Sequence, residues 1–192
     1  GQDQTPWASF LGSGDRLAAG DYAGISIGPY PPEGESASSV IDEGSSTQAA
    51  FSADGSMVFV PPGDGKTGLF DVDTGERIGR LRRWGGRWRS SLSPAGEWLA
   101  TSPSWGWVWI WDTDTGRRRH EYAGHTRAVN SLSFSPDGAR LVSSSDDYTA
   151  AVLDTATGEE RLRLRGHTGA VTGAFFRRSS GDIVTSSRDG TL

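Results

Sequence analysis

The most conspicuous chemical signal in the sequence is a lysine in a glycine-rich loop. The segment VPPGDGKTG (60–68) ends in Gly-Lys-Thr, as a phosphate-binding loop does, and the strand-like MVFV lies directly before the loop. However, Val60 occupies the position of the loop's first glycine. The residues after Lys66 predict a strand and a turn instead of the helix whose N-terminus would hold phosphate. We therefore predict no nucleotide site here.

A second segment is similar to a zinc site. HEYAGH (120–125) contains the residues of the zinc-protease motif HExxH, but it has one residue too many. On a helix, two histidines five positions apart point to different faces, and this segment predicts strand and loop in any case. The chain also lacks cysteine, which excludes disulfides, thiolate zinc sites and cysteine catalysis. We predict no metal and no cofactor.

Composition narrows the class of protein. With 192 residues the chain is long enough for a buried core, and it has no apolar stretch that approaches a membrane helix. The net charge of −5 argues against nucleic acid as a partner. Lys66 is the single lysine among 19 basic residues, which suggests a GC-rich genome, and we expect a bacterial one. We expect a cytoplasmic protein, and Gly1 suggests a fragment of a longer one.

Internal repeats in the sequence show which strands and turns the chain forms. Several short motifs recur at intervals of 41 or 42 residues: SADG, SPAG and SPDG begin at 52, 93 and 135, TG at 74, 115 and 157, and GHT at 124 and 166. Within 128–165, apolar alternation and turn residues predict four short strands. Four short strands per unit of about 42 residues are typical of a propeller blade.

These residues resemble the WD-repeat β-propeller family. The resemblance is carried best by AGHTRAVNSLSFSPDGARLVSSSDDYTAAVLD (123–154) and RGHTGAVTGAFFRRSSGDIVTSSRDGTL (165–192), and SPAGEWLATSPSWGWVWIWD (93–112) keeps the Trp-Asp ending. It implies an all-β fold of four four-stranded blade units plus an incomplete fifth, with a ring that this chain alone does not close. The expected units are 7–41, 48–82, 87–123, 128–165 and 170–192. We place an irregular Pro/Gly/Ser insertion at 28–39, between units one and two.

The resemblance also implies a hydrogen-bonded set of His, Ser or Thr, Asp and Trp in each blade. The positions that match are His125, Ser143 and Asp147 in unit four, His167, Thr185 and Asp189 in unit five, and Thr101 and Trp111 in unit three. Unit three has Arg83 and Trp105 at the His and Asp positions, and unit four has Leu153 at the Trp position. A His, a Ser and an Asp could instead form a hydrolytic triad. An enzyme needs only one triad, so the repetition favours a structural role and no catalysis.

Four tryptophans alternate in WGWVWIW (105–111). On a strand all four side chains would point to one face, and packing between neighbouring blades is the simplest role for Trp107, Trp109 and Trp111. Trp105 lies at a turn where other units have Asp. It either packs against the next blade or is exposed and binds a ligand or partner. Arginines cluster at the expected fourth strands, where they either block edge-to-edge pairing or form a basic rim for an acidic partner.

For function, the resemblance implies a non-catalytic protein-interaction scaffold or regulatory module. In bacteria such domains often follow a kinase, protease or NTPase module, which would lie in parts missing from this chain. The alternative is a propeller that senses a small molecule or a glycan. We expect a protein partner whose identity is unknown, no nucleic acid, no membrane, and self-association through the open ends of the propeller.

The loop after each Gly-His and the turn before each third strand are expected on one face of the fold. Their residues differ from unit to unit, and such variation is where a scaffold can encode its partner. The candidates for partner binding are Trp84, Ser104, Trp105, Thr126, Arg127, Asp146, Thr168 and Arg188.

Overall fold

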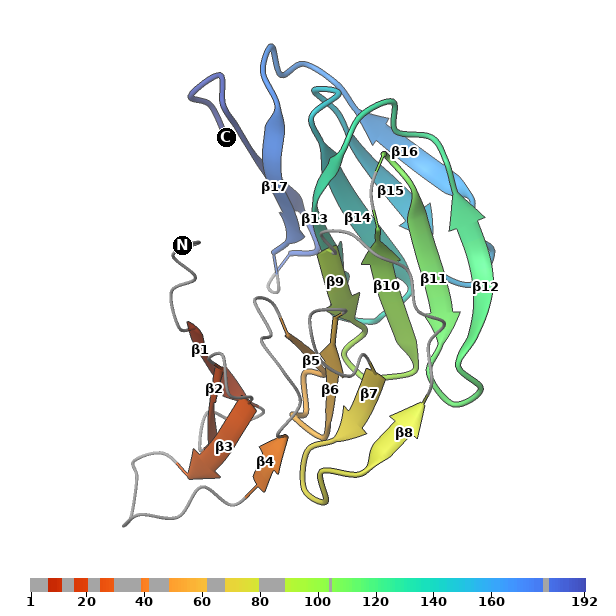
Figure 1. Ribbon diagram of the computed structural model, residues 1–192. Helices are drawn as coiled ribbons and strands as arrows, with labels where there is room; N and C mark the ends of the chain where they lie inside the picture. Colours follow the sequence, from red (N-terminus) through yellow and green to blue (C-terminus); the bar gives the residue numbers. More distant parts are fainter. Residues whose placement is uncertain are drawn as a thin grey trace. The chain divides into compact units, whose positions relative to one another are not determined.

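The computed structural model describes residues 7–11, 16–20, 25–29, 39–41, 49–61, 68–79, 89–103, 105–177 and 180–192. Each element in these ranges is a β strand (Figure 1), so the all-β fold class is confirmed. The chain forms two compact units, Gly1–Trp84 and Gly85–Leu192, which are described separately below.

The first unit contains two four-stranded antiparallel sheets. Their strands are β1 (Trp7–Leu11), β2 (Arg16–Gly20), β3 (Ile25–Pro29) and β4 (Ser39–Ile41), then β5 (Ala50–Phe51), β6 (Met57–Val60), β7 (Gly68–Asp71) and β8 (Arg77–Gly79). A buried cluster contains Ile25 and Ile27 of the first sheet together with Val58, Val60 and Phe70 of the second. Apolar contact between faces of neighbouring sheets therefore holds this unit together.

Two strands of the first sheet flank the expected Pro/Gly/Ser insertion at 28–39, so these strands belong to the expected unit 7–41. β3 ends at Pro29, β4 begins at Ser39, and Ile27 pairs with Ser39 across the two strands. A three-residue fourth strand is too short to show alternation in the sequence, so the sequence pattern did not reveal it. Residues 30–38 of the insertion lie outside the described ranges.

The second unit contains two further four-stranded sheets and one two-stranded sheet, all antiparallel. Their strands are β9 (Arg89–Leu92), β10 (Trp98–Ser102), β11 (Val108–Asp112) and β12 (Arg117–Tyr122); β13 (Val129–Phe134), β14 (Arg140–Ser145), β15 (Ala150–Asp154) and β16 (Glu160–Leu164); and β17 (Val171–Phe176) and β18 (Ile183–Ser187). Each sheet uses strands that are consecutive in the sequence. Among the described strands, none of the sheets combines the two ends of the chain.

The sheet β13–β16 is buried on both faces because its central strands are apolar at successive positions. Leu141 and Leu153 pack with Ile110 of the preceding sheet, whereas Val142 and Val152 pack with residues of β17. Side chains of a strand alternate between its faces, so an unbroken apolar run serves two interfaces at once. This two-sided burial is the packing expected of a propeller blade between its neighbours.

The repeated SPDG-type motif forms the turn between the first two strands of a sheet. In β13–β14, the Ser135 hydroxyl donates to Asp137 Oδ1 (2.5 Å), and the Gly138 amide donates to the Ser135 carbonyl (2.8 Å). Gly138 has a φ of 71°, a left-handed conformation that glycine adopts at little cost. Gly55 and Gly96 adopt the same left-handed conformation and donate to Ser52 and Ser93, so these turn residues recur because the same backbone geometry recurs in three of the sheets.

Candidate interaction surface

The set predicted for unit four comes together as a chain of hydrogen bonds. His125 lies in the loop before β13, Ser143 on β14, and Asp147 in the turn between β14 and β15. His125 Nδ1 lies 2.8 Å from Asp147 Oδ2, and His125 Nε2 lies 2.9 Å from the Ser143 hydroxyl. Thr149, at the end of the turn, donates its hydroxyl to Asp147 Oδ1 (2.6 Å). These contacts fasten a loop, a strand and a turn to one another.

Burial and hydrogen bonding set the charges in this chain. Burial lowers the pKa of His125 and outweighs the opposing effect of the Asp147 carboxylate, so His125 is neutral at pH 7. Burial alone would raise the pKa of Asp147, but hydrogen bonds from Thr149 and His125 bring it down to about 2. A neutral imidazole that donates from Nδ1 must accept at Nε2, so the Ser143 hydroxyl is the donor there.

Unit five repeats this arrangement. His167 Nδ1 lies 3.0 Å from Asp189 Oδ2, and His167 Nε2 lies 2.9 Å from the Thr185 hydroxyl. Thr191 donates its hydroxyl to Asp189 Oδ1 (2.7 Å) and so takes the place of Thr149 in unit four. The Thr191 hydrogen bond is the main reason why the pKa of Asp189 lies below its ordinary value.

The geometry of the unit-four set supports a positioning role better than hydrolysis. The Ser143 side chain is completely buried, and its cross-strand neighbour Ala151 belongs to the apolar cluster on one face of the sheet. A nucleophile must reach the carbonyl that it attacks, and a hydroxyl enclosed in this way cannot do so. The same constellation in unit five shows that it belongs to the blade and not to one reaction centre.

In unit three the polar set consists of one hydrogen bond between two neighbouring strands. Trp111 on β11 donates its indole Nε1–H to the Thr101 hydroxyl on β10 (2.8 Å), and this hydrogen bond is buried. Arg83, at the histidine position, lies outside the described ranges. The turn before β11, where other units have the aspartate, contains Trp105.

A further network, which we did not predict, joins two neighbouring sheets. Tyr122 on β12 donates to Glu160 Oε2 on β16 (2.5 Å), and Arg163 on β16 donates both to Tyr122 and to Glu160. The Arg163 hydrogen bond lowers the pKa of Glu160 to about 2, so the carboxylate is ionised. Arg163 Nη1 also lies 4.0 Å from Asp147 Oδ2, which brings this network to the edge of the His125 set.

The outer-strand arginines are neutralised by acidic neighbours at several positions. Arg119 donates to Asp112, Arg161 to Asp154 and Arg118 pairs with Glu121. Such pairing leaves little positive charge at these positions to attract an acidic partner. It favours the role of guarding exposed strand edges, because charged side chains there oppose edge-to-edge association.

Around Trp105 the structure brings together exposed aromatic and basic side chains. Trp105 is 82% exposed, Trp107 39% and Tyr148 43%. The packing predicted for Trp107 is therefore wrong, because β11 begins only at Val108 and leaves Trp107 in the turn. Trp109 and Trp111, on the strand itself, are buried as predicted.

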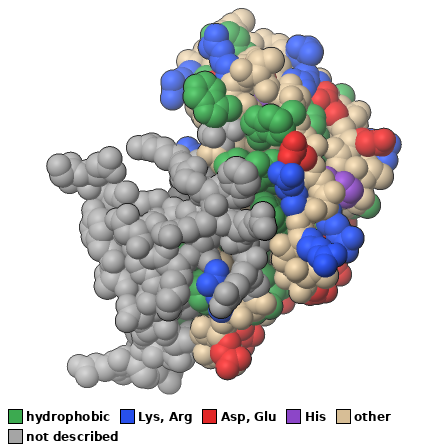
Figure 2. Space-filling model, turned by 45° about the vertical axis from the view of Figure 1, so that its right-hand side comes forward, with side chains coloured by type: hydrophobic (Ala, Val, Ile, Leu, Met, Phe, Trp, Pro, Cys, Tyr) green, Lys and Arg blue, Asp and Glu red, His purple; other side chains and the backbone are tan. Residues whose placement is uncertain are grey.

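Close backbone contact joins this turn to the loop after His125. A Cβ atom on Gly106 would lie 2.3 Å from the His125 carbonyl oxygen and 2.8 Å from that of Arg127, so only glycine fits there. The Arg127 guanidinium lies over the Tyr148 ring, 5.8 Å from its centroid. The four side chains of Trp105, Trp107, Arg127 and Tyr148, called the aromatic surface below, thus stand on two turns and one loop that meet. Figure 2 shows hydrophobic side chains next to basic ones on the described part of the molecule.

The other predicted partner-binding residues have varied positions. Thr126, Thr168 and Arg188 are exposed, in the loops and turns where they were expected. Asp146 is half-buried and accepts a hydrogen bond from Asn130 Nδ2 (2.8 Å), so it fixes the loop. Trp84 and Ser104 lie outside the described ranges.

Sequence reasoning missed two residues of this surface, Trp107 and Tyr148, and Tyr148 had a signal in the repeat. Tyr148 lies 42 positions after Gly106 and 42 before Gly190, and all three have left-handed φ angles of 84°, 72° and 85° in chain order. A tyrosine between two glycines at one repeat position was therefore a readable signal of backbone strain.

The described residues contain no helix long and apolar enough to span a membrane. In the same ranges, no group of three or more His, Asp or Glu side chains is placed to hold a metal ion. The lysine of the glycine-rich loop lies outside them, and a strand, β7, begins two residues after it.

Comparison with known families supports the repeat assignment. Residues 116–154 and 158–192 match the family described as WD domain, G-beta repeat. No curated protein matches the chain.

Proposed function

Because residues 116–154 and 158–192 are WD40 repeats, we propose that the chain is a non-catalytic scaffold that binds a partner protein through the aromatic surface. WD40 domains are commonly protein-interaction modules, and the resemblance by itself names neither a partner nor a face. The aromatic surface supplies a candidate for the face.

The observation that carries the proposal is the backbone conformation of two residues of the aromatic surface, Trp105 and Tyr148. Trp105 has a φ of 61° and Tyr148 a φ of 72°, the two non-glycine residues with positive φ in the described ranges. A left-handed backbone costs an L-residue about 1–2 kcal/mol, which glycine would avoid. Burial does not offset this cost at Trp105, since the side chain is largely in solvent. Residues held in such conformations cluster at binding and switch sites.

The chemistry of the surface fits a protein better than a small molecule. Trp, Tyr and Arg dominate the energetics of protein interfaces. Small-molecule sites enclose most of their ligand, whereas the Trp105 ring protrudes. The contact of Gly106 with the His125 loop fixes the turn in place before binding, which lowers the entropy cost of association.

A cross-linking experiment can identify the partner. A photoreactive phenylalanine derivative replaces Trp105 in the native host, and the same group at Asp114 serves as the control. Asp114 is exposed in the turn between β11 and β12, at the other end of β11. We expect a protein that is cross-linked from position 105 and not from position 114.

The captured partner is then titrated against purified variants. Trp105→Ala and Arg127→Ala should each weaken binding by about fivefold or more, roughly 1 kcal/mol, with an unchanged melting temperature. A lower melting temperature together with unchanged affinity would show that Trp105 packs against the fold and would remove it from the site.

A further inference from the structure

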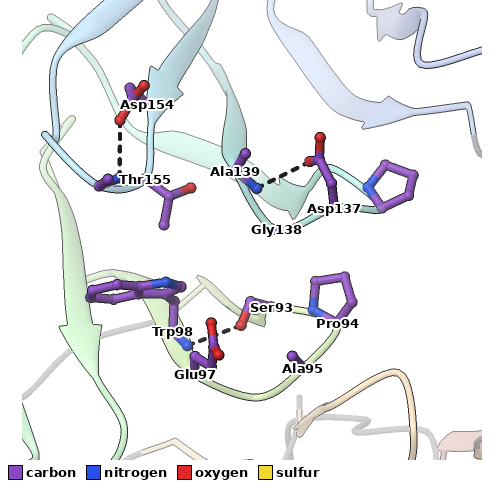
Figure 3. A pocket seen from close by; sticks show the side chains of 12 residues that line it. Ser93, Pro94, Ala95, Glu97, Trp98, Asp137, Gly138, Ala139, Asp154 and Thr155 are labelled. Atoms are coloured by element: carbon purple, nitrogen blue, oxygen red, sulfur yellow. Dashed lines mark hydrogen bonds between the residues drawn. The ribbon is translucent and has the colours of Figure 1, made fainter.

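A pocket of about 360 Å³ lies between two sheets of the compact half Gly85–Leu192, away from the aromatic surface. Its walls are the turns β9–β10, β13–β14 and β15–β16 (Figure 3). The aromatic surface instead uses the turn β14–β15 and the loop before β13. Because consecutive strands are antiparallel, these two sets of turns lie at opposite ends of the β13–β16 sheet.

One buried polar atom in the pocket wall has no partner. The Thr155 side chain points into the space between the two sheets in Figure 3, and the residue is only 2% exposed. Its hydroxyl has no hydrogen-bond partner among the described residues. A buried hydroxyl without a partner costs free energy, and such groups in native proteins call for an explanation.

The preceding sheet, β9–β12, shows how a threonine hydroxyl at this repeat position normally finds a hydrogen-bond acceptor. Thr113 lies 42 residues before Thr155, and its backbone amide donates to Glu97 as that of Thr155 donates to Ala139. The Thr113 hydroxyl donates to the Gly96 carbonyl (2.6 Å). The Thr155 hydroxyl, in the pocket wall, has no such acceptor.

The charge of the wall is negative. None of the 12 lining residues is basic, and three of them are Glu97, Asp137 and Asp154. Asp154 is already paired with Arg161 and adds little. The Ser135 hydrogen bond holds the pKa of Asp137 below its ordinary value, so Asp137 is ionised at pH 7. Glu97 is exposed on the opposite wall, and its carboxylate extends toward the space in Figure 3.

The rest of the wall is flat and apolar. The half-buried Trp98 packs against the core and also lines the pocket, together with Pro94 and Pro136. A tryptophan ring beside carboxylates favours a cation with a flat face, since guanidinium groups stack on indole rings better than ammonium groups do. Guanidinium offers only N–H donors, and the Thr155 hydroxyl and the carboxylates can accept them.

We propose that this pocket binds an arginine side chain of a partner protein. The guanidinium lies on the Trp98 ring, donates to Thr155 Oγ1 and is neutralised by Glu97 and Asp137, while the aliphatic stem contacts the two prolines. The volume is at the lower end of the range of about 300–1,000 Å³ for ligand sites, which suits one long side chain. This assignment does not depend on the aromatic surface.

The test uses the 192-residue chain and capped amino acids as probes. N-acetyl-L-arginine methylamide is titrated while the indole N–H signal of Trp98 and the amide signal of Gly138 are followed by NMR. We expect saturable shifts with a Kd of about 1–10 mM, as befits a single side chain. The neutral isostere N-acetyl-L-citrulline methylamide should bind at least about tenfold more weakly, because it lacks the charge.

Variants assign the contacts. Thr155→Val and Glu97→Gln should each weaken arginine binding about tenfold, whereas Glu159→Gln, an exposed position outside the pocket, should not change it. Trp105→Ala should also leave it unchanged, which separates this pocket from the aromatic surface. The proposal is overturned if no saturable shift occurs, if the citrulline probe binds equally well, or if Thr155→Val has no effect. Tighter binding of free arginine than of the capped form would also overturn it, because the site would then recognise a metabolite.

Discussion

Asp147 Oδ2 accepts a hydrogen bond from His125 Nδ1 across 2.8 Å and thereby joins the turn β14–β15 to the loop before β13. The same oxygen accepts the backbone amide of Thr126 (3.1 Å), and the other carboxylate oxygen accepts from Thr149. One buried carboxylate thus positions the loop that carries Arg127 and the turn that carries Tyr148. The aromatic surface therefore depends on a polar set that it does not include.

Removal of that carboxylate should be costly. Asp147→Ala leaves the buried His125 Nδ1–H without its acceptor, and we expect a loss of about 1–3 kcal/mol in the free energy of unfolding, measured by urea denaturation. Asp114→Ala is the control, since this aspartate is exposed in a turn and should change stability by no more than about 0.5 kcal/mol. Equal losses in the two variants would contradict the role given to the set.

Stability should fall as the solution is acidified, through two groups of the polar set. His125 has a pKa below its ordinary value of about 6.5, mainly because of burial. Below that pH the unfolded chain binds a proton that the folded chain refuses, so the free energy of unfolding decreases by up to about 1.4 kcal/mol per pH unit. Asp147 adds a second loss, between about pH 4 and its folded pKa of about 2.

The contribution of His125 can be measured alone between pH 7.5 and 5.5. His125→Gln should be less stable than the parent chain at pH 7.5. Its stability should depend less on pH, because glutamine does not bind a proton in either the folded or the unfolded chain. An NMR titration of the imidazole carbons should show His125 neutral well below pH 6.5. A His125 that titrates above 6.5, or a variant with the same slope as the parent, would argue against a buried neutral histidine.

The blades could be predicted from the sequence because their signals are local and repeated. The turns at Ser135–Gly138 and the apolar run of β14 each need particular residues at fixed spacing, and the 42-residue register shows them several times. The His, Ser or Thr and Asp members of the polar set were accessible in the same way, through His125 and His167, whereas Thr149 and Thr191, which also donate to the aspartates, were not predicted.

Other features depend on contacts between sheets, which leave no mark in one repeat. The network of Tyr122 with Glu160 and Arg163 joins two sheets, and each residue by itself is an ordinary tyrosine, glutamate or arginine. The exposure of Trp107 depends on where β11 begins, which alternation alone does not fix. The unpartnered hydroxyl of Thr155 depends on the opening of a pocket beside it.

Tyr148 offers a test of backbone strain. Tyr148→Gly relieves the left-handed conformation, and Tyr148→Ala keeps it while it also removes the contact with Arg127. We therefore expect the glycine variant to be more stable than the alanine variant by about 1 kcal/mol, the reverse of the usual order. Calorimetric melting of the two proteins side by side measures this difference. Both variants should lose affinity for a partner of the aromatic surface, since both lack the ring.

Thr155 and Thr113 form a matched pair for the last prediction, because they occupy one repeat position with opposite hydrogen bonding. Thr113→Val removes the donor to the buried Gly96 carbonyl and should lower the free energy of unfolding by about 1–3 kcal/mol. Thr155→Val replaces an unpartnered hydroxyl by a methyl group of similar shape, so stability should stay the same or rise.

Urea denaturation of the two variants under one set of conditions gives the comparison. The substitution is chemically identical in both proteins, so differences in helix or strand propensity cancel, and the contrast reports the hydrogen bond alone. A stable Thr155→Val protein that has lost arginine binding would show that the hydroxyl serves a ligand and not the fold. A loss of stability as large as that of Thr113→Val would mean that the Thr155 hydroxyl has a partner within the folded chain, and the case for the pocket would fall with it.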